Sequence, residues 1–272
     1  MTDFDDWTAD DAARHIAVPG PNDDKYSRGV LGIVTGSDQY PGAAVLTVEA
    51  ALRTGVGMVR YLGPERATTL VLQRRPEAVA SDGRVQAWLL GSGTDHAARE
   101  EGSLARSRAA LDEGIPVVLD GGALELFEHA TGPVVITPHA GELARLLGIE
   151  RSDVNAETAV RASRELGVTV LLKGHESFAV GGEERLVARS APSWLATAGA
   201  GDALAGILGA LVATHAEAQG SELARLAATA SVVHGLAAER ASAGGPLTVL
   251  DLAESIPSVI ACLLAREQGA RR

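Results

Sequence analysis

The segment ATAGAGDALAG, residues 196–206, sets four small residues before an aspartate and continues into a helical pattern with almost no polar side. Aspartate is a good helix N-cap because its carboxylate accepts hydrogen bonds from the first free amides, and Asp202 suits that role. Alternatively, the run from Ala198 to Gly201 keeps side chains away from the helix start, so that a phosphate binds directly to backbone N–H groups. Asp202 would then be a base directed at whatever attacks the phosphate. The segment alone leaves both interpretations open.

Short β-branched runs alternate with helical patterns on the N-terminal side of this segment. The expected strands cover residues 29–36, 57–63, 84–93, 115–122, 132–139 and 167–176. Helical patterns fill most of the gaps, beginning with the alanine-rich residues 42–55. This alternation predicts a mainly parallel sheet with helices on both faces. Residues 181–185 are expected to form a hairpin turn, and residues 243–248 a loop before the last helix.

In such sheets, ligands bind in the crevice outside the carboxyl ends of the strands. The residues of this sequence that could take part in ligand binding or catalysis fall at those ends. They are Ser37, Tyr40, Gly91, Gly93, Asp120, His139, Lys173 and Gly174. The sequence therefore predicts one ligand site along this edge of the sheet.

The segment TPHAGELARLLG, residues 137–148, adds a second feature at a strand end. Gly141 opens a helix whose first turn carries Glu142, a position where a carboxylate is favoured by the helix dipole alone. His139 can likewise be an ordinary loop histidine. The histidines are scattered and there is one cysteine, so a zinc cluster is not expected. A hard ion held mainly through phosphate oxygens and water needs no more than Glu142.

The composition narrows the class of protein. A formal net charge of −11 over 272 residues argues against binding nucleic acid through its phosphates, which requires clustered Lys and Arg. The N-terminal residues are acidic and are not expected to act as a secretory signal, and no apolar run is long enough to span a membrane. The single cysteine, Cys262, lies in the apolar run SVIACLLA and is expected to be buried and inert. These features predict a soluble, cytoplasmic protein.

The chain shows no repeat, low-complexity tract or convincing linker. Residues 1–24 are expected to form an N-terminal extension, a short helix and a turn-rich stretch, that packs on the outside of the protein. Residues 25–272 are expected to form a single domain.

The motifs together resemble a known family. ATAGAGDALAG resembles the signature of the ribokinase-like superfamily, in which a Gly-x-Gly-Asp turn at a helix start forms an anion hole. Within it, SDQYPGAAVLTVEAALRTGVGMV (37–59), TPHAGE (137–142), LLKG (171–174) and ATAGAGDALAG, in this order, resemble the ADP- or ATP-dependent NAD(P)H-hydrate dehydratases. The small-molecule kinases of the superfamily usually have Thr-Pro-Asn where this chain has Thr-Pro-His. The resemblance runs from about Lys25 to the final helices.

This resemblance implies a three-layer ribokinase-like fold and a reaction. Hydrated NADH or NADPH would be dehydrated at the expense of ADP, giving NAD(P)H, AMP and phosphate, with Mg²⁺ as the metal. Asp202 would be the base, and the amides of Gly199, Ala200 and Gly201 would hold the transferring charge.

The same resemblance assigns the contacts. The hydrate would contact Tyr40, Ala43, Ala44, Gly93, His139 and Asp202. The nucleotide would contact Lys173, Gly174, His175, Glu176, Ser177 and Gly201, and Glu142 would act on Mg²⁺ through water. The family further implies ADP rather than ATP, a homotetramer, and a separate protein that interconverts the two epimers of the hydrate.

The sequence also departs from the family pattern. DGGAL (120–124) replaces an Asp-Ala-Asp-Ala-Leu run, so Gly122 stands where a carboxylate is frequent. The usual Gly-Pro-Gly-x-Gly loop is shortened to GSGTD (91–95), and RSAPSWLATAG (189–199) replaces the Asn-x-Thr-Gly-Asn form. These changes affect the expected substrate contacts more than the anion hole. The alternatives are a vitamin-precursor kinase of the same fold, which would stop after phosphoryl transfer, and a non-catalytic nucleotide sensor.

Overall fold

The computed structural model describes residues 3–95 and 101–270, without the side chains of residues 268–270. In these ranges the strands form one sheet with the order β1-β9-β8-β7-β6-β5-β4-β2-β3. The strands are β1 (Asp5–Asp6), β2 (Val30–Val34), β3 (Met58–Tyr61), β4 (Ala87–Leu90), β5 (Val117–Leu119), β6 (Val134–Ile136), β7 (Thr169–Leu172), β8 (Ser177–Gly181) and β9 (Glu184–Ala188). Neighbouring strands pair in parallel except at β8, which is antiparallel to both β7 and β9.

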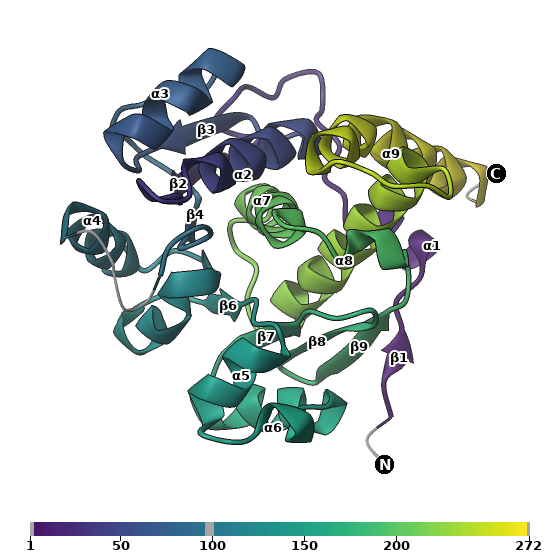
Figure 1. Cartoon of the computed structure of the whole chain (residues 1–272). Coiled ribbons are helices and arrows are strands. Elements are labelled where there is room, and N and C mark those ends of the chain that lie inside the picture. The colour runs from purple at the N-terminus through teal and green to yellow at the C-terminus, as the bar shows by residue number, and fades with distance from the viewer. Residues whose placement is uncertain (1–2, 96–100, 271–272) are drawn as a thin grey trace.

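Helices cover both faces of this sheet and give three layers (Figure 1). One layer holds α2 (Pro41–Thr54), α7 (Ala200–Ala213), α8 (Ser221–Ser242) and α9 (Val249–Ala270). The opposite layer holds α4 (Glu101–Leu111), α5 (Ala140–Leu147), α6 (Ala156–Leu166) and the 3₁₀ helix η1 (Gly121–His129). The remaining elements are α1 (Ala9–Ala13), α3 (Glu65–Arg74), η2 (Arg151–Asp153) and η3 (Ser193–Leu195). The fold is therefore the mainly parallel, three-layer α/β architecture that the sequence predicts.

The two hydrophobic cores follow from the alternation of side chains along each strand. In β2, Leu31 and Ile33 pack into the core beneath α2 and α7, whereas Val30 and Val34 pack into the core on the opposite face. All five residues of β2 are buried. Strands that are apolar on both faces are typical of a parallel sheet between two helical layers, as the sequence predicts.

Helix α7 lies at the centre of its layer, and its lack of a polar side matches its burial. Its residues from Ala203 to Ala213 are all buried. A side chain at Gly206 would put its Cβ 2.3 Å from the carbonyl oxygen of Thr47 in α2, so only glycine permits this approach. The close contact fixes the start of α7 relative to α2, and with it the Gly-Asp turn.

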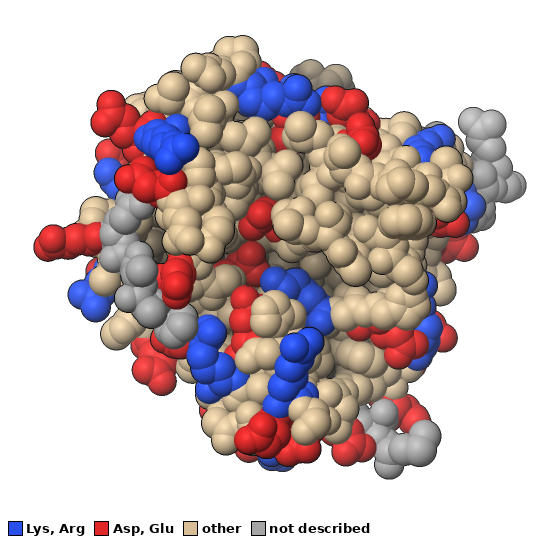
Figure 2. Space-filling view, viewed as in Figure 1, with Lys and Arg blue, Asp and Glu red and all other residues tan. Residues whose placement is uncertain are grey.

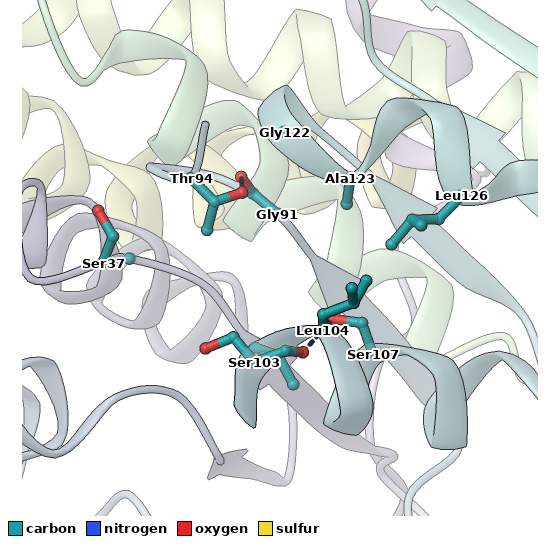
Figure 3. Close-up of a pocket in the computed structure, with 11 residues that line it drawn as sticks. Ser37, Gly91, Thr94, Ser103, Leu104, Ser107, Gly122, Ala123 and Leu126 are labelled. Carbon is teal, nitrogen blue, oxygen red and sulfur yellow. Dashed lines mark hydrogen bonds between the residues drawn. The ribbon is translucent and has the colours of Figure 1, made fainter. Parts of the chain in front are cut away.

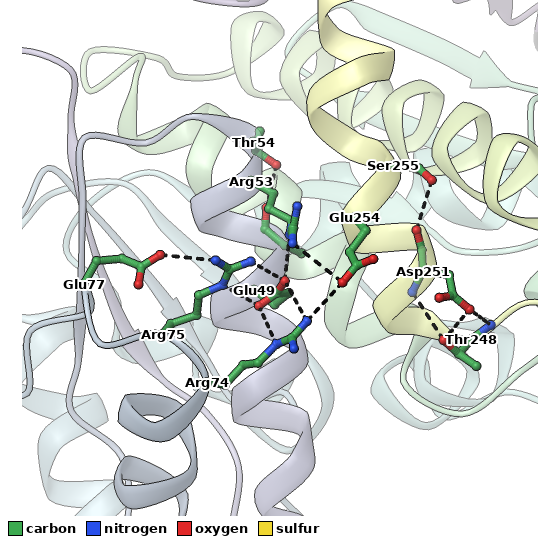
Figure 4. A network of polar contacts seen from close by, with 11 residues as sticks. Glu49, Arg53, Thr54, Arg74, Arg75, Glu77, Thr248, Asp251, Glu254 and Ser255 are labelled. Carbon is green, nitrogen blue, oxygen red and sulfur yellow. Dashed lines mark hydrogen bonds and ion pairs between the residues drawn. The ribbon is translucent and has the colours of Figure 1, made fainter.

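A buried carboxylate ties α2 to α3 (Figure 4). Glu49 of α2 is fully buried, and Arg53, Arg74 and Arg75 donate hydrogen bonds to it. Burial raises the pKa of Glu49, but the hydrogen bonds from the three guanidinium groups outweigh it and bring the pKa to about 2. Glu254 of α9 also pairs with Arg74, at 3.3 Å. The network joins three helices at a distance from the strand ends.

The structure confirms the strands and turns expected from the sequence and corrects two details. The hairpin turn lies between β8 and β9, and a loop precedes α9. In the extension, α1 packs on α8 and α9, but Asp5 and Asp6 also add a strand beside β9, which the sequence did not predict. The prediction that Cys262 is buried is wrong, because its side chain is exposed beside Arg240. Among the described residues, no helix combines the length and apolar character that crossing a membrane requires.

Candidate active site

The carboxyl ends of four adjacent strands meet at Asp120, which follows β5. Its carboxylate is 4% exposed and accepts hydrogen bonds from Ser92 Oγ after β4 (2.9 Å), Thr137 Oγ1 after β6 (2.7 Å) and Lys173 Nζ after β7 (2.6 Å). Parallel strands bring these residues to one edge of the sheet although they are far apart in the sequence. Sequence analysis placed Asp120 at this edge but did not assign it a partner.

Asp120 and Lys173 form a charged, buried pair. Burial raises the pKa of Asp120, but the ammonium of Lys173 and the surrounding hydrogen bonds hold it below its usual value. Burial lowers the pKa of Lys173, and the carboxylates of Asp120 and Glu142 more than offset this, so that it stays above its usual value. The pair therefore keeps both groups charged and holds the Lys173 ammonium at the end of β7.

The start of α7 lies beside this charge. Gly199 is the N-cap, with φ of 89°, so Asp202 is the third residue of the helix and is not its cap. A Cβ at Gly199 would lie 2.5 Å from Leu46 Cδ1, and one at Gly201 would lie 3.5 Å from Lys173 Nζ. The start of α7 therefore lies next to the ammonium group, with no side chain at Gly201 between them. The N-cap interpretation of Asp202 is wrong, and the geometry suits an anion at the helix start.

Asp202 is half-buried in this setting and titrates near neutrality. Burial and the negative charge of Asp120 raise the pKa of Asp202 to about 7, with Lys173 opposing the rise. A carboxylate with such a pKa is a stronger base than an exposed aspartate and still releases its proton near neutral pH. These are the properties that a general base requires.

The start of α5 is the third part of the site. His139 is the N-cap of α5, and its Nδ1 accepts a hydrogen bond from the Glu142 amide at 3.1 Å. The Glu142 carboxylate accepts a hydrogen bond from the His139 amide at 2.7 Å and lies 3.9 Å from Lys173 Nζ. Glu142 thus completes a capping box and also faces the buried pair.

A cavity of about 780 Å³ has His139, Lys173 and Gly201 on its wall, whereas Asp120, Glu142 and Asp202 are not among its lining residues. Its walls come from the ends of β6 and β7, the segment between β9 and α7, the start of α7, and Ser231 and His234 of α8. Figure 2 shows acidic and basic side chains together in the hollow at the centre of this face. The volume is in the range that accommodates a small organic ligand.

The residues predicted to contact the nucleotide line this cavity with one exception. Lys173, Gly174, His175, Ser177 and Gly201 are on its walls. The exception is Glu176, whose carboxylate instead pairs with Arg189 at 2.6 Å. His139, predicted to contact the hydrate, lines the same cavity.

Asp202, also predicted to contact the hydrate, lies in the first turn of α7, and the remaining predicted hydrate contacts gather at the ends of β2 and β4. A Cβ at Gly93 would lie 2.2 Å from Ala43 Cβ and 3.2 Å from the Tyr40 carbonyl oxygen, so these three residues touch. Tyr40 is exposed, whereas Ala44 is fully buried.

A small pocket nearby, drawn in Figure 3, has Ser37, Gly91, Thr94 and Gly122 on its wall. A Cβ at Gly122 would lie 2.5 Å from Thr94 Oγ1. The threonine therefore occupies the space beside the glycine that replaces a frequent carboxylate.

Two residues of the cavity were missed by sequence analysis. His234 is buried in α8, and its Nε2 has no hydrogen-bonding partner among the described residues. Burial lowers its pKa to about 4 despite a favourable contact with the backbone of Ala200, so the imidazole is neutral. Arg151 of η2 also lines the cavity. Neither residue stands in a motif, so only the tertiary structure identifies it.

The fold and the glycine-rich helix start define an α/β protein of the ribokinase-like class. The NAD(P)H-hydrate dehydratase family model matches residues 31–258 of the chain. The chain therefore belongs to the NAD(P)H-hydrate dehydratase family.

Individual proteins show the same similarity. The chain is 42% identical to the "Bifunctional NAD(P)H-hydrate repair enzyme Nnr" of Mycobacterium tuberculosis over 78% of this chain and 47% of that protein. It therefore spans about half the length of the bifunctional relatives. It is 32% identical to the "ADP-dependent (S)-NAD(P)H-hydrate dehydratase" of Xanthomonas campestris over 76% of this chain and 80% of that protein.

A solved structure supports the fold. The ADP/ATP-dependent NAD(P)H-hydrate dehydratase of Bacillus subtilis, co-crystallised with ATP and Mg²⁺, superposes with a TM-score of 0.84. The similarity covers 97% of this chain and 100% of that chain at 23% sequence identity.

Proposed function

We propose that the protein dehydrates hydrated NADH and NADPH to NADH and NADPH, with ADP as the phosphoryl donor and AMP and phosphate as products. The observation that carries this proposal is the geometry at the start of α7, where Gly201 and Asp202 lie beside the ammonium of Lys173. Membership of the dehydratase family supports the choice of reaction.

The chemistry begins with a poor leaving group. The hydrate carries a hydroxyl at carbon six of the nicotinamide ring, and hydroxide does not leave readily. Asp202 accepts the hydroxyl proton while the oxygen attacks the terminal phosphoryl group of ADP, and AMP departs. The amides of Gly199, Ala200 and Gly201 and the nearby ammonium stabilise the transferring charge. The ring nitrogen then expels phosphate, and loss of the proton from carbon five restores the dihydropyridine.

The oxygen-rich surroundings of the site fit Mg²⁺. Among the described residues, no three His, Cys, Asp or Glu side chains cluster as a ready metal site, so nucleotide oxygens and water would supply most ligands. The Glu142 carboxylate lies 3.9 Å from Lys173 Nζ and would hold the hydrated ion on the nucleotide side. When bound, the ion would neutralise charge on the phosphates.

The two ligands are assigned to the two ends of the site. The nucleotide would occupy the cavity in front of Lys173, Gly174 and Gly201, held largely by backbone groups. The hydrate would lie against Tyr40, Ala43 and Gly93, with His139 between the two. The family resemblance extends the proposal to a homotetramer in the cytoplasm, and the mass of the protein in solution tests the assembly.

The test of this function is the recovery of NADH from hydrated NADH when ADP is added. A vitamin-precursor kinase would use the same Asp202, but it would phosphorylate its own alcohol and leave hydrated NADH unchanged. Thr-Pro-His at residues 137–139, in place of Thr-Pro-Asn, favours the dehydratase.

Two replacements of His139 separate its expected contact with the hydrate from its role as the N-cap of α5. His139→Ala removes both the imidazole and the cap of α5, whereas His139→Asn removes the imidazole and keeps a capping side chain. We expect both variants to raise KM for the hydrate more than the Kd for ADP, and only His139→Ala to lose roughly 1 kcal/mol of stability. Steady-state kinetics, ADP titrations and thermal melts measure these effects. An equal loss of affinity for both ligands would remove His139 from the hydrate side.

A further inference from the structure

The charges around the cavity do not by themselves favour an anionic ligand. Asp120, Glu142 and Asp202 contribute three carboxyl groups near Lys173, whose single ammonium is already hydrogen-bonded to Asp120 at 2.6 Å. The whole chain carries a formal net charge of −11. A nucleotide brings several negative charges into this setting, so a further cation from the protein would favour its binding in addition to Mg²⁺.

Arg151 is placed to supply this positive charge. It begins η2, directly after the turn that ends α5, and its side chain lines the cavity together with His139 and Lys173. A Cβ at Gly141 would lie 4.0 Å from Arg151 Cδ, so the side chain runs past the first turn of α5. Among the described residues, Arg151 makes no ion pair and no side-chain hydrogen bond.

Several other arginines are already paired with carboxylates. Arg145, on α5, pairs with Glu125 at 3.3 Å and does not line the cavity. Around Glu49, Arg53 and Arg74 are committed to a buried carboxylate. An unpaired guanidinium at a cavity wall gains little for folding, but its planar set of N–H donors matches the oxygens of a phosphate.

We propose that Arg151 binds a phosphate group of a nucleotide in this cavity, and so acts as a substrate-binding residue. The inference rests on the proposed function, because that function places nucleotides here. The phosphate belongs either to ADP or to the dinucleotide hydrate, whose ribose also carries a phosphate when it derives from NADPH. All three ligands present the same chemistry to a guanidinium.

The test compares Arg151→Gln with Arg145→Gln, which removes an arginine of the same region that does not face the cavity. Binding of ADP, hydrated NADH and hydrated NADPH is measured by calorimetry at low and at high salt. We expect Arg151→Gln to weaken binding of at least one of them about tenfold at low salt, and less at high salt. We also expect an unchanged melting temperature without ligand, and wild-type binding by Arg145→Gln.

The pattern of loss identifies the phosphate. A loss confined to ADP assigns it to that nucleotide, a loss shared by both hydrates assigns it to their common pyrophosphate, and a loss confined to hydrated NADPH assigns it to the ribose phosphate. If all three dissociation constants stay within twofold of wild type, or if Arg145→Gln shows the same loss, the inference is overturned. If the wild-type protein binds none of the three, the proposed function fails first and the inference with it.

Discussion

Asp202→Asn is expected to lower the rate of NADH recovery by about 10²–10⁴-fold, the usual contribution of a general base. Asparagine has nearly the same size but accepts no proton from the attacking hydroxyl. The binding of ADP should persist, because the proposed function assigns it to backbone amides and Lys173. In the wild-type protein, activity should fall as the pH drops below about 7, where Asp202 becomes protonated.

The stability of the same variant separates a catalytic from a structural role. The folded pKa of Asp202 is about 7 and its ordinary value is 3.8, so the folded state binds more protons between these pH values. The wild-type protein therefore loses stability as the pH rises through this window. Asparagine does not ionise and so avoids this loss of stability. Asp202→Asn should therefore melt at the same temperature as wild type or higher at pH 8.

A matched control is Asp251→Asn, in the first turn of α9, because this aspartate is exposed and caps its own helix through Thr248. It should leave turnover unchanged. Turnover of Asp202→Asn near the wild-type rate would contradict the role of Asp202 as the base.

The second large effect is expected from Lys173→Met, which should cost about 3–5 kcal/mol of stability and abolish activity. Methionine keeps the length of the side chain but leaves the carboxylate of Asp120 buried without its cation. Only the hydroxyl hydrogen bonds of Ser92 and Thr137 would remain. Thermal melts and NADH recovery measure the two effects.

The loss of stability caused by Lys173→Met should increase with pH. In the wild-type protein the pKa of Asp120 is held low, so the ion pair stabilises the fold above the ordinary pKa of aspartate. Without Lys173, burial raises the pKa of Asp120, so the deficit should be larger at pH 8 than at pH 5. The double variant Asp120→Asn/Lys173→Met removes the unpaired charge and should recover part of the stability. Equal stability of Lys173→Met and wild type at pH 8 would show that the pair does not hold the site together.

Much of the fold could be predicted from the sequence because local patterns decide it. Each strand of the central sheet is a short apolar run followed by glycine or polar residues, and the helices between the runs fix a parallel arrangement. The strand ends that carry Asp120, His139 and Lys173 therefore could be placed at one edge before any contact was known. The two-residue strand β1 could not, since Asp5 and Asp6 are acidic and its pairing depends on β9.

The contacts within the site were not predictable in the same way. Asp120 and Lys173 are 53 residues apart, and nothing local to either residue signals the pair. Arg151 is one of many charged residues until the fold places it on the cavity wall. The burial of Cys262 was predicted wrongly from its apolar neighbours. Val259 and Leu263 form the buried side of α9, while the thiol faces outward.

The proposed reaction of this protein is the ADP-dependent dehydration of hydrated NADH. The direct measurement is absorbance at the reduced-nicotinamide band after ADP and Mg²⁺ are added to hydrated NADH and the wild-type protein, with AMP and phosphate assayed in parallel. Absorbance should return only when ADP is present, with one AMP and one phosphate formed for each NADH, and Asp202→Asn should slow the recovery by about 10²–10⁴-fold. No recovery of NADH by active, ADP-binding protein would contradict it.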